Sequence, residues 1–522
     1  MLTASATEMS DFFNNPFIAF SAGFGIGPIP LGFAKRRLYP AVKSYPNGKA
    51  KYAPYGLRKV EAILLENGFS ESEVAVVHPD NLDQFIGPKT KVVGISSMDP
   101  TGMGYVSKTY SSIIGGGEPL NSLEFQKLIS NPAIKKFKPK LIAGGFGAWQ
   151  LERKKMTDKY SIDSVFIGNN PSTIVEIFKK VVNNEKIPRI IREVNSLSKW
   201  DYEKMPICKH AAIHGAVEIS KGCGRKCQFC TPTVQHKVDI PLEKIMKEVN
   251  LTIQEGSEHI TLVTEDLFLY GSKDSKFKPN KKAVINLIKN IANNNGVRGI
   301  QASHISLAPV VNSPEMIKEL TNILIEHTVY CFGKKDIITA ETGIETGSSR
   351  LMKKYMAGKM LPYKPEQWQD IITSAFGILN DNSWCPLATL IIGLPDENEE
   401  DVLETIELMD KLKNFKAFYV PLFFVPLENC VLMNNKGADL DSLSKARWDL
   451  FIKCWEYNIR LWKPTFLKNR IQNPILYKAV NNLLIPYFAT IMGFYYGFTR
   501  GKQLKEAFWS LGITQGQTIN KE

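Results

Sequence analysis

The chain has 522 residues, of which 44% are hydrophobic and 22% are charged. This length predicts two or three domains, and the composition excludes a disordered or fibrous protein. The net charge of +13 comes from basic residues that are scattered along the chain, as on a solvated surface, so we expect no nucleic-acid partner.

The N-terminus and the cysteine content indicate the compartment. The first residues, MLTASATEMSDFFNNPF, have no basic patch followed by an apolar run, so we expect no signal peptide. Eight cysteines without such a leader fit a reducing compartment, where clustered thiols bind metal or do chemistry. The sequence therefore predicts a cytoplasmic protein.

Residues 1–190 alternate short apolar runs with amphipathic stretches, which predicts an N-terminal Rossmann-like α/β domain with a parallel sheet. Strands are expected within residues 17–24, 73–79, 91–98, 140–147 and 163–170, and helices within residues 55–69 and 171–184. Small and glycine-rich segments follow several of these strands. In open sheets of this kind, ligands bind beyond the carboxyl ends of the strands.

A polar connector over residues 191–212 predicts an interdomain linker. The strand–helix alternation then resumes over residues 213–425, which predicts a central partial (β/α)6 barrel with its chemistry at the carboxyl ends of the strands. The six strands are expected within residues 215–220, 259–266, 298–307, 336–345, 385–394 and 416–425. Residues 426–522 are expected to be mainly helical and related to substrate binding.

One apolar and aromatic run, residues 481–498, raises the question of a membrane. Pro486 interrupts it, and a spanning helix needs about 20 mostly apolar residues. We expect no transmembrane segment and a helix docked on the core, with peripheral membrane contact as the alternative.

Three cysteines lie within eight residues, in the order Cys223, Cys227 and Cys230, after the first expected barrel strand. Three thiolates suit a soft metal site, either zinc or an iron–sulfur cluster. Structural zinc with His236 as fourth ligand is the alternative, although zinc usually staples small modules with paired ligand hairpins.

The spacing C-x3-C-x2-C, with an aromatic residue before the third cysteine, resembles the radical S-adenosylmethionine (SAM) enzymes. The segments LVTEDLFLYG, AETGIETGSSRLMKKYMAGK and ATLIIGLPDENEEDV resemble the second-, fourth- and fifth-strand regions of that family. The resemblance implies a 4Fe–4S cluster held by the three cysteines, with one iron open to SAM. It implies SAM contacts from Phe229, Thr264, Glu265, Glu341, Ile391 and Gly393.

An α/β domain before such a barrel looks like the cobalamin-binding domain of class B radical SAM methyltransferases. The segments GISSMDPTG, AGGFGAW and FIGNNPSTIVEI carry this resemblance. It implies cobalamin contacts from Ser96, Ser97, Met98, Asp99, Gly144, Gly145, Ile167, Gly168 and Asn169. No Asp-x-His-x-x-Gly motif occurs, so a lower histidine ligand to cobalt is not expected, and a Rossmann-like unit with another cofactor or none is the alternative.

The resemblance implies methylation of an unactivated carbon, with methylcobalamin as methyl donor and a 5′-deoxyadenosyl radical generating the substrate radical. Relatives with the same two domains catalyse cyclisation or rearrangement without net methylation, and that alternative stays open. A non-catalytic cluster scaffold or sensor is a further alternative. Methylthiotransferases carry three further cysteines in their front domain, whereas residues 1–207 here contain none, which disfavours methylthiolation.

The expected partners are a protein or peptide substrate and an external one-electron reductant in an anaerobic cytoplasm, with a small-molecule substrate as the alternative. The basic and aromatic C-terminal sequence could bind a protein, a peptide or a lipid-like molecule. The richness in Ile, Lys and Asn points to an AT-rich genome, and the resemblance extends to protein C-methyltransferases of methanogenic archaea.

Overall fold

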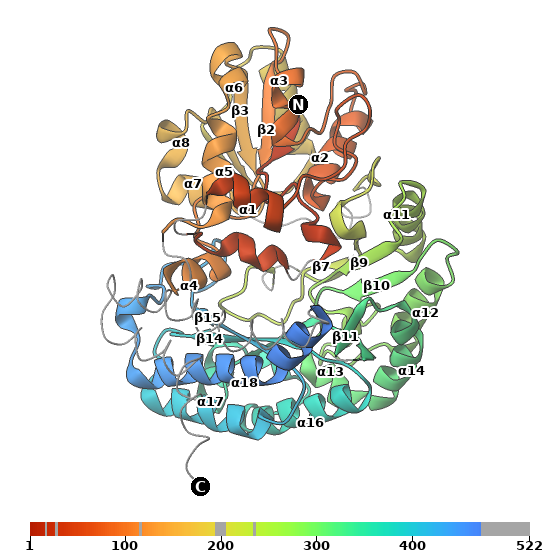
Figure 1. The fold of residues 1–522 in the computed structure, drawn as a ribbon, viewed down its shortest axis with the longest axis vertical. Helices are drawn as coiled ribbons and strands as arrows, with labels where there is room; N and C mark the ends of the chain where they lie inside the picture. The colour runs from red at the N-terminus through yellow and green to blue at the C-terminus, as the bar shows by residue number, and fades with distance from the viewer. Residues whose placement is uncertain are drawn as a thin grey trace.

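The computed structural model describes residues 1–15, 18–26, 30–113, 117–193, 205–232, 236–332 and 334–470. These residues form a mixed α/β structure in which a parallel sheet lies above a second group of strands and helices (Figure 1). The upper sheet is formed by the N-terminal part of the chain, and the lower group by the part that follows residue 213.

The front sheet has five parallel strands in the order β1-β2-β3-β4-β5. These strands are β1 Leu2–Ala4, β2 Val92–Ser96, β3 Lys140–Gly144, β4 Ser164–Ile167 and β5 Ile190–Arg192. Val92 and Val93 point to opposite faces, as successive strand residues do, and each joins a different apolar cluster. The sheet is therefore buried on both faces, as parallel sheets usually are.

Helices cover both faces of the front sheet. The cluster around Val92 includes residues of α2 and α9, and the cluster around Val93 includes residues of α4 to α7. The helices of this part are α1 Leu31–Leu38, α2 Tyr55–Glu66, α3 Leu82–Phe85, α4 Tyr105–Ile113, α5 Leu120–Ile129, α6 Pro132–Phe137, α7 Trp149–Arg153, α8 Met156–Lys159 and α9 Pro171–Val182.

The strand predicted over residues 17–24 is wrong. Residues Ile18–Gly23 form a 3-10 helix, and Gly23 lies so close to α4 that a Cβ there would be 2.7 Å from a methyl of Val106. A short apolar run fits a buried helix as well as a strand, so periodicity alone could not decide. The first strand is instead the fully buried β1, and within residues 73–79 only Val76 pairs, with Leu2.

Six further strands form the predicted partial (β/α)6 barrel. They are β6 Ala216–Glu218, β9 His259–Val263, β10 Gly299–Ala302, β13 Glu341–Glu345, β14 Leu387–Ile392 and β15 Phe418–Phe423. They pair in parallel as β6-β9-β10 and β13-β14-β15. Parallel pairing of His304 with Glu341 joins the two sheets, and the Glu341 amide donates to the Ser303 carbonyl at 2.9 Å.

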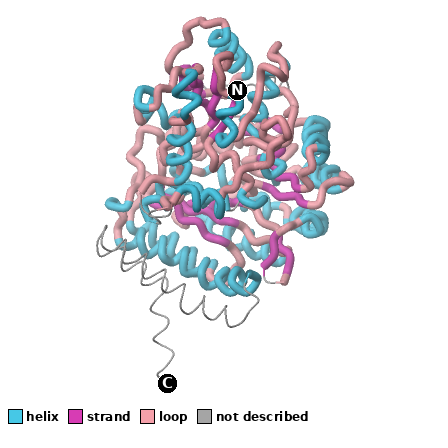
Figure 2. Tube along the Cα trace, turned by 45° about the horizontal axis from the view of Figure 1, so that its top comes forward, coloured by secondary structure: helices cyan, strands magenta, loops and turns pink. Residues whose placement is uncertain are grey.

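Helices surround these strands on the outside (Figure 2). They are α11 Leu242–Gln254, α12 Lys281–Ala292, α13 Leu307–Asn312, α14 Pro314–Leu324, α15 Ser349–Tyr355, α16 Trp368–Asp381, α17 Glu399–Leu412 and α18 Lys445–Arg470. Two small antiparallel pairs complete the strands, β7 Ser220–Lys221 with β8 Val238–Asp239 and β11 Tyr330–Phe332 with β12 Lys335–Ile337.

The structure describes only part of the C-terminal region, residues 426–522, that was expected to be mainly helical. Helix α18 packs against α17 and β15, whereas residues 481–498 lie outside the described residues. Among the residues that the structure describes, no helix has the length and hydropathy needed to cross a membrane.

Arg58 of α2 ties the front sheet to the start of the barrel. Its side chain is 1% exposed, and its guanidinium donates to the carbonyl oxygens of Ala50, Lys51 and Ala211 and to the Glu61 carboxylate. A buried cation with this many acceptors leaves several unpaired oxygens when it is removed.

We therefore predict that Arg58→Met lowers the free energy of unfolding by about 3–5 kcal/mol, because it leaves the Glu61 carboxylate buried and unpaired. Urea denaturation of the apoprotein measures this. Lys247→Met is the control, because Lys247 forms an exposed ion pair with Glu243. Equal urea midpoints for the two variants would contradict the prediction.

Candidate functional site

The three cysteines lie in the loop between β7 and β8, at the carboxyl end of the first barrel strand. Cys223 and Cys227 are buried and Cys230 is half-buried. Three residues between or before them, Gly222, Gly224 and Lys226, have positive φ angles of 72°, 74° and 61°. The loop therefore turns tightly. Within it, the Cys230 amide donates to the Cys227 carbonyl at 3.2 Å.

Arg225 is buried inside the same loop. Its Nη2 lies 2.8 Å from Asp266 Oδ2 and donates to Ser306 Oγ at 2.9 Å, and its Nη1 lies 4.0 Å from Cys223 Sγ. Its Nε is buried without a hydrogen-bond acceptor. This arrangement fixes a positive charge beside the Cys223 sulfur.

A second buried ion pair lies near Cys227. Lys359 Nζ pairs with Glu345 Oε1, and the two side chains are 14% and 8% exposed. Burial raises the pKa of the Cys227 thiol to about 11, and the positive charge of Lys359 is the strongest influence that lowers it. The cysteine loop is therefore flanked by two paired cations that can offset thiolate charge.

The side chains after β9 differ in their environment. Thr264 Oγ1 lies 2.6 Å from Ser220 Oγ and accepts from the Asp266 amide, so it holds two loops together. Glu265 Oε2, in contrast, is buried with no hydrogen-bond partner. Burial, and then the charge of Glu218, raise the pKa of Glu265. A buried carboxylate oxygen without a hydrogen-bond partner is an acceptor suited to an ammonium group.

Glu341, at the start of β13, forms an ion pair with His304, with 3.1 Å between Oε2 and Nε2. Burial lowers the pKa of His304, but the hydrogen bond and the charge of Glu341 raise it above its ordinary value, and Glu265 acts in the same direction. Glu341 is thus the carboxylate that contacts His304, and the charge of Glu265 acts on the same imidazole.

The remaining residues expected to contact SAM lie on separate parts of the site. Phe229 is buried in the cysteine loop and Ile391 is buried in β14. Gly393 follows β14 with φ of 82°, and its amide donates to Glu397 Oε2 at 2.9 Å. A Cβ at Gly393 would lie 2.6 Å from Ala438 Cβ, so a side chain would not fit there.

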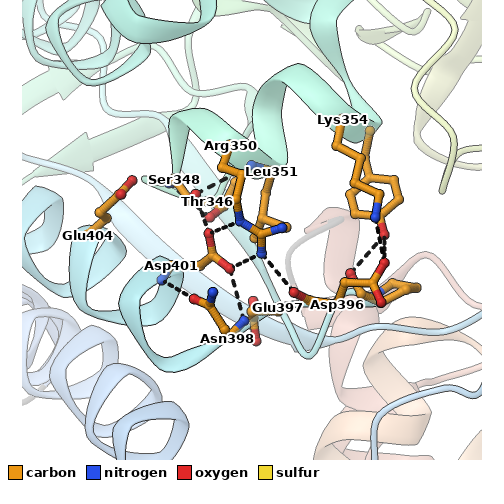
Figure 3. A network of polar contacts seen from close by, with 12 residues as sticks. Thr346, Ser348, Arg350, Leu351, Lys354, Asp396, Glu397, Asn398, Asp401 and Glu404 are labelled. Carbon is orange, nitrogen blue, oxygen red and sulfur yellow. Dashed lines mark hydrogen bonds and ion pairs between the residues drawn. The ribbon is translucent and has the colours of Figure 1, made fainter.

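A polar network ties the loop after β14 to α15 (Figure 3). The Asp401 carboxylate accepts from Ser348 Oγ at 2.6 Å and from Arg350, whose guanidinium also reaches the Asp396 carbonyl. Asp396 accepts from Lys354 Nζ at 2.6 Å. These contacts hold α15 and the segment after it in one position relative to the barrel.

The residues expected to contact cobalamin follow β2, β3 and β4. The loops after β2 and β3 contact each other through their backbones, because the Gly147 amide donates to the Ser97 carbonyl at 2.8 Å. Gly145 has φ of 93°, and a Cβ there would lie 2.7 Å from the Ser97 carbonyl oxygen. Met98 and Phe146 are 59% and 50% exposed.

Each of the other expected cobalamin residues has a defined place. Asp99 is buried and accepts from the Gly104 amide and from Gln150 at 2.9 and 2.8 Å, so it orders the loop. Ile167 is buried in β4, whereas Ser96, Gly144, Gly168 and Asn169 are half-buried at or after strand ends.

Two carboxylates at this edge were not anticipated from the sequence. Glu8 accepts from Ser97 Oγ and the Met98 amide, both at 3.0 Å. Glu193, after β5, accepts from the Asn170 amide at 3.2 Å and from Thr173, at the N-terminus of α9. Glu8 follows β1 and Glu193 follows β5, so each contacts a loop that belongs to another strand. No local sequence motif indicates such contacts.

The edge of the front sheet formed by the carboxyl ends of its strands lies opposite the corresponding edge of the barrel. Helix α4, which follows the loop after β2, places the Tyr105 hydroxyl 3.2 Å from the carbonyl oxygen of Phe229, to which it donates. Figure 1 shows α4 between the front sheet and strands β14 and β15. The cysteine loop and the loops of the front sheet therefore meet at one interface.

Residues 217–409 match the family model of the radical SAM superfamily. These residues are a radical SAM domain. A domain of this kind implies a 4Fe–4S cluster and SAM. The chemistry of the donor set fits the cluster, since three thiolates leave one iron open and two buried cations offset their charge. Among the described residues, no group of three or more His, Cys, Asp or Glu side chains is placed to hold a single metal ion.

Several curated proteins resemble the chain in sequence. It is 24% identical over 367 residues to a tRNA-2-methylthio-N(6)-dimethylallyladenosine synthase of Fusobacterium nucleatum, covering 67% of this chain and 76% of that protein. It is 22% identical over 347 residues to the threonylcarbamoyladenosine tRNA methylthiotransferase MtaB of Aquifex aeolicus, covering 65% and 75%.

Among solved structures, the chain resembles the radical SAM methyltransferase TsrM from Kitasatospora setae. In the TsrM structure with cobalamin and a 4Fe–4S cluster bound, the TM-score is 0.53 at 12% identity, covering 76% of this chain and 78% of that one. A TsrM structure with tryptophan substrate and a SAM analogue bound also has a TM-score of 0.53, at 13% identity, covering 73% and 72%. At these identities the likeness concerns the fold.

The buried carboxyl of Glu8 is expected to make the free energy of unfolding depend on pH. Burial raises its pKa from 4.5 to about 7, against the hydrogen bonds from Met98 and Ser97 that lower it. A carboxyl with a raised folded-state pKa stabilises the fold below its unfolded pKa and loses that contribution as the pH rises through 7.

We predict that Glu8→Gln gains roughly 3 kcal/mol in unfolding free energy relative to wild type between pH 4.5 and pH 8. Urea denaturation across this range measures the difference. Glu73→Gln is the control, because hydrogen bonds from Ser70 lower the pKa of Glu73, which stays ionised throughout. Parallel pH profiles for Glu8→Gln and wild type would contradict the account.

Proposed function

We propose that this protein is a radical SAM enzyme, and specifically a cobalamin-dependent methyltransferase that methylates an unactivated carbon. The observation that carries the proposal is the contact between α4 and the cysteine loop, because it sets the loop edge of the front sheet against the mouth of the barrel. A corrin on one edge and SAM on the other would then share one substrate. In this proposal residues 1–190 bind cobalamin, residues 213–425 bind the cluster and SAM, and residues 426–522 contribute to the substrate site.

Different residues of the barrel would bind the cluster and SAM. Cys223, Cys227 and Cys230 would hold the cluster, and Glu265 would accept hydrogen bonds from the amino group of SAM through its unpaired oxygen. Glu341, held by His304, would approach the ribose. Phe229, Thr264, Ile391 and Gly393 would shape the rest of the SAM site.

The loops of the front sheet suit a large, largely apolar ligand. Met98, in the loop after β2, and Phe146, in the adjoining loop after β3, are both exposed. Burial of these apolar side chains against a corrin would be favourable. The glycines at 144 and 145 permit close backbone approach. Glu193 occupies the N-terminus of α9, where a dinucleotide would need its phosphates, and this disfavours a dinucleotide at that loop.

When bound, the cofactors would supply a 5′-deoxyadenosyl radical for hydrogen abstraction and a methyl group on cobalt for transfer. The chain itself would position both groups and keep water from the space between them. The contacts of α4 would set the distance between the two edges, and an external one-electron donor would be needed.

Two alternatives differ in the reaction. Cyclisation or rearrangement would use the same cofactors and differ only in substrate geometry. Methylthiolation is favoured by the names of the curated relatives, but residues 1–207 offer no cysteine for a second cluster. We propose a carbon of a protein or peptide residue as methyl acceptor in an anaerobic cytoplasm, which the basic and aromatic sequence after residue 460 would help to bind.

Anaerobic reconstitution with iron, sulfide and cobalamin tests the proposal. We predict about four irons and one corrin per chain, with the iron lost in Cys227→Ala because one of three cluster ligands is removed. Gly145→Val is predicted to lower corrin retention several-fold while iron is kept, because its side chain would meet the Ser97 carbonyl.

Gly56→Ala, at a position in α2 where a Cβ meets nothing within 4 Å, is the control and is expected to retain both cofactors. Four irons without retained corrin in the wild-type protein would remove cobalamin from the mechanism. Zinc in place of iron would overturn the proposal as a whole.

A further inference from the structure

The last turn of α15 and the segment that follows it pack directly against the cysteine loop. The Gln228 amide donates to the Tyr355 carbonyl at 2.8 Å, and Gln228 Nε2 donates to the Lys354 carbonyl at 2.9 Å. A Cβ at Gly358 would lie 2.1 Å from the Arg225 carbonyl oxygen. The backbone of this segment therefore touches the loop between its first and second cysteines and again between its second and third.

Lys359 ends this segment and is almost fully buried in its pair with Glu345. The pair is built by an irregular backbone, since β13 shifts register between Gly343 and Glu345, and Glu345 has φ of 65°. A Cβ at Gly343 would lie 1.8 Å from Glu345 Oε1 and 2.4 Å from Lys359 Nζ. A bulge with a left-handed, non-glycine residue is a local strain that proteins often keep for a function.

The positive end of the pair is carried by the segment that touches the cysteine loop. Gly358, next to Lys359 in the chain, lies against the Arg225 carbonyl, whereas Glu345 belongs to strand β13. The pair is neutral as a whole, but Lys359 brings its positive end to the side of the loop. In a buried site such a dipole acts with little screening by water.

We propose that Lys359 is a positioning residue for the cysteine loop and that its buried charge raises the reduction potential of the cluster held there. Reduction adds one electron from an external donor and breaks no bond, so the cluster gains one negative charge. A nearby fixed cation stabilises that reduced state, as net charge and surroundings do in iron–sulfur sites generally. The inference rests on the proposed function, because it requires a cluster on the three cysteines.

The network of Figure 3 holds this cation in place. Lys354, one residue before Tyr355, pairs with Asp396, and Arg350 of the same helix pairs with Asp401. The helix that carries the Lys359 segment is therefore anchored to the loop after β14 on one side and to the cysteine loop on the other.

A redox titration of the reconstituted protein without SAM, followed by electron paramagnetic resonance, tests the inference. Lys359→Gln is expected to shift the midpoint potential to a more negative value, and Lys359→Arg is expected to keep it near that of wild type. The double variant Lys359→Gln, Glu345→Gln is expected to fall between Lys359→Gln and wild type, because it also removes the opposing charge.

Lys353→Gln is the matched control, because it removes an exposed lysine of α15 that is not part of the network in Figure 3, and it is expected to leave the potential unchanged. Iron content per chain is measured for every variant. A wild-type potential in Lys359→Gln with the cluster present would overturn the inference and leave the proposed function standing. Failure of the wild-type protein to assemble a cluster would instead overturn the proposed function.

Discussion

Three hydroxyl groups on one helix join the two halves of this protein. In α4, Tyr105 donates to the Phe229 carbonyl, Thr109 Oγ1 accepts from the Phe423 amide at 2.8 Å, and Tyr110 donates to the Pro421 carbonyl at 3.0 Å. Their spacing places them near one another on the helix surface. Because α4 begins just after the loop that follows β2, these bonds hold the loop edge of the front sheet against the mouth of the barrel.

Burying charge is the second constraint at this interface. Arg225 and Lys359 would be costly to bury alone, and each is paired with a carboxylate from the end of another barrel strand, Asp266 or Glu345. The ends of β9 and β13 are thereby tied to the cysteine loop. In the proposed function the same pairs would place positive charge beside the thiolate ligands of the cluster, so one set of contacts would serve both structural stability and redox chemistry.

Much of the barrel could be predicted from the sequence because its signals are local. Each strand is a short apolar run between helices, and the motif-bearing segments follow the strands in order. The pairing of His304 with Glu341 could not be predicted, since it joins two separate three-stranded sheets. The position of Lys359 depends on a bulge and a left-handed residue in β13, which no local pattern indicates.

In the front part, the β2, β3 and β4 strands were predicted because their apolar runs are continuous. The first strand was missed because β1 has only three residues at the N-terminus, and the run at 17–24 was taken for a strand although it packs as a helix under α4. Glu8 follows β1 and Glu193 follows β5, and each contacts a loop that another strand carries, so their positions depend on tertiary structure alone.

The central claim is that two cofactors face each other across the α4 contact. Pulsed electron paramagnetic resonance on the reconstituted protein, with Co(II) cobalamin and the reduced cluster together, tests it most directly. The account predicts a dipolar coupling between the two signals that disappears when Cys227→Ala removes the cluster. Two independent signals with no coupling, in a protein that retains both cofactors, would contradict it.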